Sequence, residues 1–428
     1  MRSVRGFKLP WFVLLAICCA APATAQSSYP ELTPLNLALE LSGMAEPLPV
    51  EVLIEAALVF SGIPGGSLPA KRQTLMDAVG AFRLEISGVR DETQLGEAAL
   101  AYLHERLLRS YSLNQMRVDV ALDTSVFNCL SSAVLYLVFA RSAGLSVKGV
   151  LTKDHALCMV DVDGVLTDVE TTNPYGFNPG TKKEFKDLFG KTTGYSYVPV
   201  GNYSNRRTIG EKELLGRILH DRASLEIQRG NYLAAVQPTV SAYALINAED
   251  FLKARTAALS NYAVSLGMKG EFAKAVAFID EAESAFGPDR ELEQRRADLL
   301  YNRLVSLLEG GKIAEAESVL GKDPSGSGLA REDWIELSIF AVQKRAEAAQ
   351  YAGSYPETVA IVAEGLSRIG RVSMLLKTYE SYVHNWFAAL FNTRKYEEAR
   401  SVLLSGLTVY PESAAFAQDL KLVEKALQ

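Results

Sequence analysis

The stretch NCLSSAVLYLVFARSAG, residues 128–144, is the part of the sequence that decides the fold. It is apolar nearly all round for about fifteen residues and ends at Gly144. This pattern is typical of a buried helix that stops at a glycine. We therefore expect a buried helix that begins at Cys129.

After Gly144 the hydrophobic period changes to two, which indicates strands. Short strands are expected at 147–151, 155–162 and 165–171. Asp163 and Gly164 separate the last two strands and favour a two-residue hairpin turn. The sequence therefore predicts one buried helix followed by a small antiparallel sheet.

The residues before this stretch have helical periodicity. Helices are expected at 47–59, 69–84 and 92–111, with glycines between them. Asp91 is a suitable N-cap for the third helix. Residues 26–46 contain Pro and Ser and are expected to be a loose lead-in, so the α+β domain is assigned to residues 47–205.

A short phrase then recurs five times. Each copy has a turn residue, a large apolar or aromatic residue two positions later, and a small residue three positions after that. The copies begin at Gly230, Gly270, Gly311, Gly353 and Arg394, at spacings of 40, 41, 42 and 41 residues. The pattern resembles a tetratricopeptide (TPR) array with a stretched period, and it predicts an all-α solenoid over residues 206–428. Such a solenoid offers a protein partner an extended surface.

The N-terminus has the features of a secretory signal peptide over residues 1–25. Three basic residues precede a short apolar stretch, and an Ala-Thr-Ala cleavage site ends at Ala25. The protein is therefore expected to be exported, to the periplasm or the extracellular space, without a transmembrane segment. A lipoprotein anchor at Cys18 or Cys19 is the alternative, but Ile17 stands where such anchors have a small residue.

Removal of this segment leaves 41 basic and 50 acidic residues, a net charge of −9. A moderately acidic protein is not a natural nucleic-acid binder. Two cysteines remain, Cys129 and Cys158, and no motif indicates a metal or a cofactor. The two could form a single structural disulfide, which is one interpretation of the chain.

The other interpretation is that Cys129 is a nucleophile. A thiol with a pKa of about 8.5 is mostly protonated at neutral pH, and a helix N-terminus and a nearby imidazole both favour the reactive anion. Cys129 is expected at such an N-terminus.

The hairpin supplies the partners. A two-residue turn pairs residues whose numbers sum to 327, which puts His155 on one face with Glu170 and Asp168. Glu170 lies diagonal to His155, so it is the better residue to orient the imidazole. Cys158 has the opposite parity and is expected to be a buried core residue.

These residues resemble the transglutaminase-like superfamily of papain-like cysteine enzymes, over roughly residues 95–200. Asn128-Cys129 opens an apolar helix like its nucleophile helix, Asp154-His155-Ala156 resembles its His strand, and the segment 168–172 falls where many members carry the acid. The resemblance implies a Cys129–His155–Glu170 triad.

The function expected from this resemblance is cleavage of a peptide or carboxamide bond, as in a protease or amidase, or transfer of the acyl group to an amine. The repeats would recruit a protein partner or substrate. The alternative is an inactive transglutaminase-like scaffold whose solenoid mediates protein–protein interaction in the cell envelope.

Overall fold

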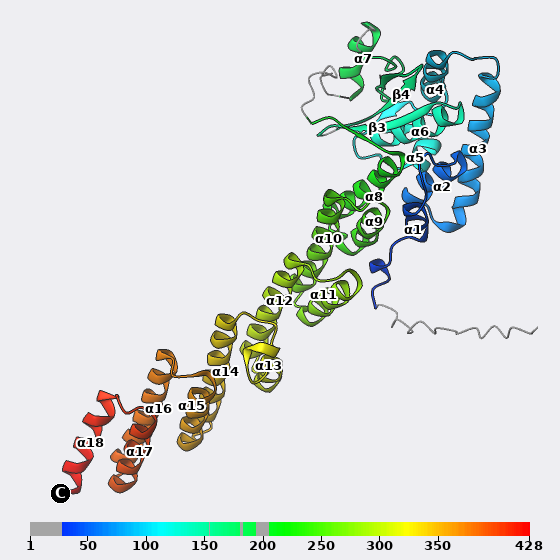
Figure 1. Cartoon of the computed structure of the whole chain (residues 1–428). Helices are drawn as coiled ribbons and strands as arrows, with labels where there is room; N and C mark the ends of the chain where they lie inside the picture. Colours follow the sequence, from blue (N-terminus) through cyan, green and yellow to red (C-terminus); the bar gives the residue numbers. More distant parts are fainter. Residues whose placement is uncertain (1–27, 154, 180–182, 194–204) are drawn as a thin grey trace, which may run out of the picture.

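The computed structural model describes residues 28–153, 155–179, 183–193 and 205–428. The predicted signal peptide lies outside these ranges. An α+β unit forms one end of the molecule, and a row of paired helices extends away from it (Figure 1). The class is therefore an α+β unit followed by an all-helical region.

The α+β unit combines helices with two small sheets. Its helices are α1 (Asn36–Ser42), α2 (Val50–Phe60), α3 (Leu68–Glu85), α4 (Glu92–Arg106), α5 (Val118–Thr124), α6 (Cys129–Ser142) and α7 (Lys183–Thr193). Its strands are β1 (Ser110–Tyr111), β2 (Val126–Phe127), β3 (Ser146–Leu151), β4 (Ala156–Val162), β5 (Val165–Val169) and β6 (Arg207–Ile209). The expected helix at 92–111 ends early, because Ser110 and Tyr111 pair with β2 instead. The sequence patterns had not indicated α5, α7, β1, β2 or β6.

Helix α6 is the central element of this unit. It begins at Cys129 as predicted, and every residue from Leu130 to Ala140 is buried. The main sheet has the antiparallel order β5-β4-β3-β6. The β4–β5 register pairs Cys158 with Val169 and Val162 with Val165, which confirms the predicted two-residue turn. Asp163 and Gly164 have φ of 50° and 83°, as such a turn requires.

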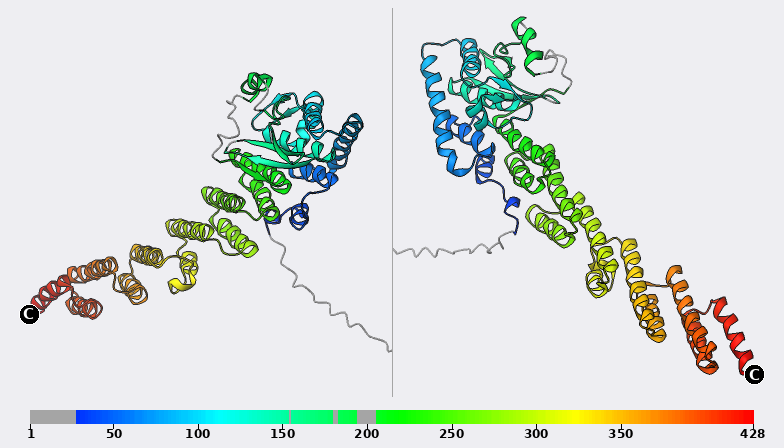
Figure 2. Two further views of the ribbon diagram at one scale, coloured as in Figure 1. Left: turned by 45° about the horizontal axis from the view of Figure 1, so that its top comes forward. Right: turned by 180° about the vertical axis from the view of Figure 1, so that it is seen from behind.

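Paired helices make up the rest of the chain. They are α8 (Glu211–Gln228), α9 (Tyr232–Leu245), α10 (Glu249–Met268), α11 (Phe272–Phe286), α12 (Arg290–Glu309), α13 (Ile313–Leu320), α14 (Arg331–Tyr351), α15 (Tyr355–Ile369), α16 (Ser373–Asn392), α17 (Tyr396–Val409) and α18 (Ala414–Leu427). Successive pairs stack side by side in all views (Figures 1 and 2).

The five repeated phrases are the turns inside these pairs. The first residue of each phrase has φ between 62° and 79°, in the left-handed region. The residue after it donates its N–H to the carbonyl five residues earlier, over 2.9–3.1 Å. This bond defines a Schellman helix end. The small residue of each phrase is 0–1% exposed, so it lies where two helices approach closely.

The lead-in is more ordered than the sequence indicated. It contains α1 and a short 3-10 helix, Pro30–Leu32. The Tyr29 ring packs edge-on against Phe278 with centroids 4.9 Å apart, and Leu32 is buried against the repeats. The expectation of a loose segment is therefore wrong for residues 28–46, because aromatic packing at Tyr29 and the burial of Ala38 and Leu41 hold it on the rest of the protein.

Helix α8 is shared between the two regions. Its residues Leu214, Leu215, Ile218 and Leu219 belong to the hydrophobic core of the α+β unit. Strand β6 just before it pairs with β3, so the region 206–428, predicted to be all-α, begins with a strand. The domain boundary expected at residue 205 therefore separates α8 from the α+β unit, although α8 contributes to the hydrophobic core of that unit.

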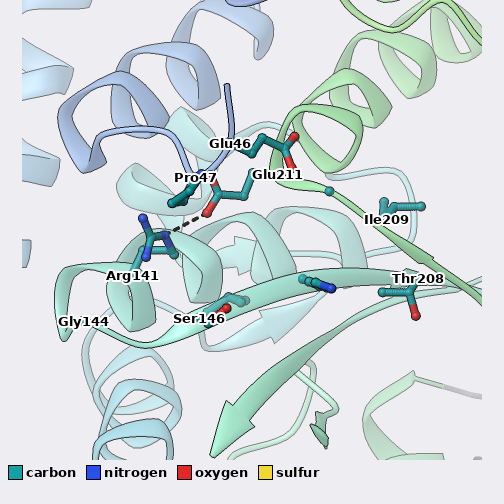
Figure 3. Close-up of a pocket in the computed structure, with 11 residues that line it drawn as sticks. Glu46, Pro47, Arg141, Gly144, Ser146, Thr208, Ile209 and Glu211 are labelled. Atoms are coloured by element: carbon teal, nitrogen blue, oxygen red, sulfur yellow. Dashed lines mark ion pairs between the residues drawn. The ribbon is translucent and has the colours of Figure 1, made fainter. Parts of the chain in front are cut away.

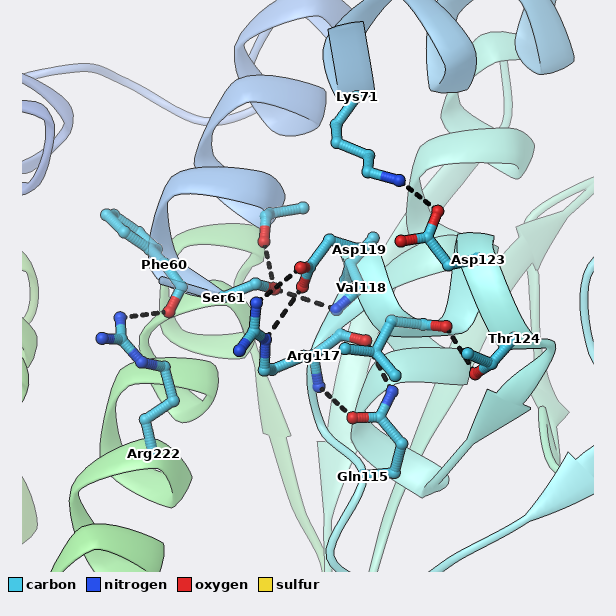
Figure 4. A network of polar contacts seen from close by, with 12 residues as sticks. Phe60, Ser61, Lys71, Gln115, Arg117, Val118, Asp119, Asp123, Thr124 and Arg222 are labelled. Atoms are coloured by element: carbon cyan, nitrogen blue, oxygen red, sulfur yellow. Dashed lines mark hydrogen bonds and ion pairs between the residues drawn. The ribbon is translucent and has the colours of Figure 1, made fainter. Parts of the chain in front are cut away.

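Polar contacts fix α8 at two levels. At its start, the buried Glu211 carboxylate accepts the Leu48 N–H at 2.6 Å and pairs with Arg141 Nε at 2.8 Å, beside a cavity of about 620 Å³ (Figure 3). Farther along, Arg222 Nη1 donates to the Phe60 carbonyl at 2.7 Å (Figure 4). These three contacts join the first repeat helix to the α+β unit.

Candidate active site

Cys129 is the first residue of α6, and a capping box determines this position. The Asn128 side chain accepts the Ser131 N–H at 2.9 Å, and Ser131 Oγ accepts the Asn128 N–H at 2.9 Å. Asn128 also donates to the Leu113 carbonyl at 3.0 Å, so the cap itself is fixed. N–H groups of a first helical turn have no intrahelical acceptor, and the helix dipole is positive there. The half-buried Cys129 thus sits at a position that favours an anion.

His155 and Glu170 lie together as the register predicted. His155 Nε2 is 2.7 Å from Glu170 Oε2, and Glu170 is only 3% exposed. The other carboxylate oxygen, Oε1, accepts bonds from Thr172 Oγ1 at 2.7 Å and from its N–H at 3.2 Å. These bonds occupy both oxygens of Glu170 and fix its orientation toward the imidazole.

The imidazole also bonds to Cys129. Burial lowers the pKa of His155, but the charge of Glu170, a hydrogen bond with Cys129, a hydrogen bond with Glu170 and the charge of Cys129 together raise this pKa well above its usual value. Because Nε2 faces Glu170, Nδ1 is the nitrogen left for Cys129. The three predicted residues therefore form one connected set in the order Cys129, His155, Glu170.

Asp168, the other acid on this face, has a different partner. Its carboxylate forms a two-pronged ion pair with the guanidinium of Arg206, which donates through Nη1 at 2.9 Å and through Nη2. Arg206 thus engages both oxygens of Asp168, whereas Glu170 faces the imidazole. The geometry agrees with the preference for Glu170 as the orienting acid.

Cys158 lies on the opposite face of β4, against α6. It is fully buried, and its Sγ donates to the Ala133 carbonyl at 3.3 Å. Burial, together with the nearby charge of Glu170, raises the pKa of the Cys158 thiol far above its usual value. Both Cys129 and Cys158 are free thiols. The disulfide interpretation therefore fails for this pair.

No protein-family model matches this chain, and no curated protein is significantly similar to it. The transglutaminase-like resemblance therefore rests on the residues alone. Within the part of the chain that the structure describes, no helix has both the length and the hydropathy of a membrane span.

A pocket of about 280 Å³ opens beside Cys129 and His155. The β3–β4 connection forms one wall through Thr152 and Lys153. Helix α8 forms the other wall through Arg217, His220 and Asp221. Sequence reasoning missed these three residues, because nothing in their local pattern indicates that the first repeat helix reaches the cysteine.

Arg217 is held firmly in this wall. Its Nη2 donates to Glu213 Oε1 at 2.7 Å and also to Asp250 Oδ2, and its guanidinium carbon lies 4.4 Å from the centre of the Phe251 ring. Glu213 and Asp250 do not line the pocket. The repeat region therefore supplies a polar, well-anchored wall next to the candidate nucleophile.

The loop that carries Glu170 turns back tightly. The Glu170 N–H donates to the Gly176 carbonyl at 2.8 Å. A Cβ at Gly176 would come within 1.9 Å of the Glu170 carbonyl oxygen, so only glycine fits at this position. The close backbone contact keeps the acid at the end of β5.

Proposed function

We propose that this protein is a transglutaminase-like cysteine enzyme that cleaves a peptide or carboxamide bond through Cys129, His155 and Glu170. The observation that carries the proposal is the connected set of hydrogen bonds from Cys129 through His155 to Glu170. An intact set of this kind supports an enzyme over the inactive scaffold, since an inactive domain has no need to keep all three groups aligned.

The raised pKa of His155 favours a protonated imidazole before substrate binds. A positive charge next to a cysteine activates it as a nucleophile. In the acylation step Cys129 Sγ attacks the carbonyl carbon, and the Cys129 backbone N–H stabilises the oxyanion. His155 then gives its proton to the leaving nitrogen as the C–N bond breaks. Glu170 stabilises the imidazolium until that transfer.

The acyl-enzyme returns to the free thiolate in a second step. Water or an amine attacks the acyl carbon, His155 takes the proton of the attacking group, and the C–S bond breaks. Water gives hydrolysis and an amine gives transfer. We favour hydrolysis, as in a protease or amidase. The pocket walled by α8 is where the acyl group or the attacking group would bind.

The leader at residues 1–25 favours an exported enzyme, in the periplasm or outside the cell. The array of paired helices would then recruit a protein substrate or partner to the pocket that it helps to form. Its stacked pairs resemble a tetratricopeptide-like solenoid, and such solenoids present extended concave binding surfaces.

Alkylation of the cysteines by iodoacetamide at near-neutral pH tests the proposal. We expect fast labelling of Cys129, strong slowing in His155→Gln, and no change in His384→Gln, which alters an exposed histidine of the last helix pair. Mass mapping assigns each adduct. Equal and slow labelling of Cys129 and Cys158, or a labelling rate of Cys129 that does not depend on His155, would overturn the proposed enzymatic function.

A further inference from the structure

The turn after β5 is an unusual place to find complete burial. Glu170, Thr171, Thr172 and Asn173 are four consecutive polar residues, and none is more than 3% exposed. Buried polar groups are costly unless they are hydrogen-bonded, and a paired network of them fixes one geometry. The partners of these residues therefore determine where the Glu170 carboxylate lies.

Thr171 is tied through both of its oxygen atoms. Its carbonyl accepts a hydrogen bond from His104 Nε2 at 3.0 Å, which connects the turn to α4. Its Oγ1 lies 2.8 Å from Ser132 Oγ on α6. A residue whose side chain and main chain bond to two different helices cannot shift without breaking one of these bonds.

The link through Ser132 continues to the candidate nucleophile. Ser132 Oγ donates to the Cys129 carbonyl at 3.1 Å, so the Thr171 hydroxyl is the donor between the two side chains. A chain of hydrogen bonds thus runs from the Cys129 main chain, through Ser132, to the residue that follows Glu170. It is a second connection between nucleophile and acid, separate from the one through His155.

His104 makes its contact as a neutral imidazole. Burial lowers its pKa to about 4, against the raising effects of the Thr171 carbonyl and the Glu170 charge. Because a carbonyl only accepts, Nε2 carries the proton. The ring also packs edge-on against Phe127, with centroids 5.7 Å apart, which fixes its direction.

We propose that Thr171 is a positioning residue of the active site, which sets the Glu170 carboxylate relative to His155 and Cys129 through its bonds to Ser132 and His104. The inference rests on the proposed function and names how its acid is placed. Catalytic groups need their geometry held to within about 0.5 Å. The backbone hydrogen bonds of Glu170 itself, to Gly176 and Asn173, lie within the same loop. Through its bond to Ser132, Thr171 connects this loop to α6, the helix that begins with the nucleophile.

Two substitutions separate the hydroxyl from the shape of the side chain. Thr171→Val keeps the branched shape and loses the bond to Ser132, whereas Thr171→Ser keeps the bond and loses a methyl group. The readout is the pKa of His155, followed by NMR on protein with carbon-13 in its histidine rings; single variants assign the four histidines. A role in shape alone would not move this pKa in the valine variant.

We expect Thr171→Val to lower the pKa of His155 and to slow the alkylation of Cys129 about fivefold, the effect of roughly one hydrogen bond. Thr171→Ser should leave both values close to those of the unchanged protein. An unchanged His155 pKa in Thr171→Val, or equal effects of valine and serine, would overturn the inference.

Ser132→Ala tests the same link from the other end, should Thr171→Val fail to fold. Its matched control is Ser142→Ala, since Ser142 Oγ makes the same kind of bond within α6, to the Phe139 carbonyl at 2.7 Å. Only Ser132→Ala should lower the His155 pKa, and an effect of equal size in Ser142→Ala would contradict the role. If Cys129 proves unreactive, the proposed function fails, yet the His155 pKa still reports whether Thr171 places Glu170.

Discussion

His155 Nε2 lies 2.7 Å from Glu170 Oε2, although both residues stand just outside the hairpin strands. His155 precedes β4 by one position and Glu170 follows β5 by one. The two-residue turn at Asp163–Gly164 sets the register that brings them together. A contact between positions fifteen residues apart thus follows from one tight turn.

Glu170→Gln should lower the pKa of His155, because the charge of Glu170 is the largest of the effects that raise it. A histidine whose folded pKa exceeds its unfolded value stabilises the fold fully below the unfolded pKa and loses this effect as the pH rises through the folded pKa. The stability advantage of the unchanged protein over Glu170→Gln should therefore be larger near pH 6 than near pH 9.

Urea unfolding at the two pH values measures this difference. Asp168→Asn is the matched control, because Asp168 shares the face of Glu170 but pairs with Arg206. The effect of Asp168→Asn on stability should not change with pH in step with the protonation of His155. An advantage over Glu170→Gln that is the same at both pH values would show that the imidazole does not depend on this carboxylate.

His104 should make the fold acid-sensitive. Burial lowers its pKa to about 4, from 6.5. Between these values the unfolded chain binds a proton that the folded protein does not, so stability is full above pH 6.5 and is lost as the pH falls toward 4. The loss is about 3 kcal/mol from this residue.

His104→Gln keeps a side-chain N–H for the Thr171 carbonyl and removes the titration. Urea unfolding from about pH 7 to about pH 4 should show a flatter decline for this variant than for the unchanged protein. His384→Gln, at an exposed histidine, serves as the comparison. Parallel declines for His104→Gln and the unchanged protein would mean that His104 is not the acid-sensitive group.

Much of the α+β unit follows from local patterns. The apolar run after Cys129 gives α6, and the Asp163–Gly164 turn gives the hairpin and the face shared by His155 and Glu170. The opposite parity of Cys158 follows from the same register. These predictions were possible because a strand alternates strictly and a two-residue turn leaves one pairing.

Other parts depend on contacts between distant segments, which a local pattern does not encode. The pocket wall at Arg217 and His220 arises because α8 packs into the core of the α+β unit. Strand β6 is too short to show a period, and it is a strand only because β3 offers it an edge. The order of residues 28–46 also comes from residues far along the chain: the rings of Tyr262 and Phe278 pack around Tyr29, and Ser241 Oγ accepts the Leu35 N–H.

Glu211→Ala should destabilise the junction between the two regions. Burial raises the pKa of Glu211, so the ion pair with Arg141 contributes little net stability by itself. Removal of the carboxylate nevertheless takes away the ion-pair partner of the Arg141 guanidinium and the hydrogen-bond acceptor of the Leu48 N–H, both in a buried site. Loss of one partner of a buried pair costs about 3 kcal/mol.

Urea unfolding followed by circular dichroism measures that cost. Glu249→Ala is the control, since Glu249 forms an exposed pair with Lys253 at the start of α10 and its removal should change stability little. Equal, small effects of the two alanine variants would mean that the Arg141–Glu211 contact does not hold α8 in place.

Arg394→Gly should stabilise the last helix pair. Four of the five repeat turns have glycine in the left-handed position, whereas Arg394 adopts φ of 62° with a full side chain. A non-glycine residue in this conformation destabilises the fold by about 1 kcal/mol. Replacement by glycine removes that strain, but glycine has more conformational freedom in the unfolded chain, which offsets part of the gain. A gain of up to about 1 kcal/mol is expected in thermal or urea unfolding.

The reciprocal change, Gly353→Ala, should lower stability in the neighbouring pair, because its φ is 79°. A loss of stability in Arg394→Gly would indicate instead that the arginine side chain makes a contact worth more than the backbone strain.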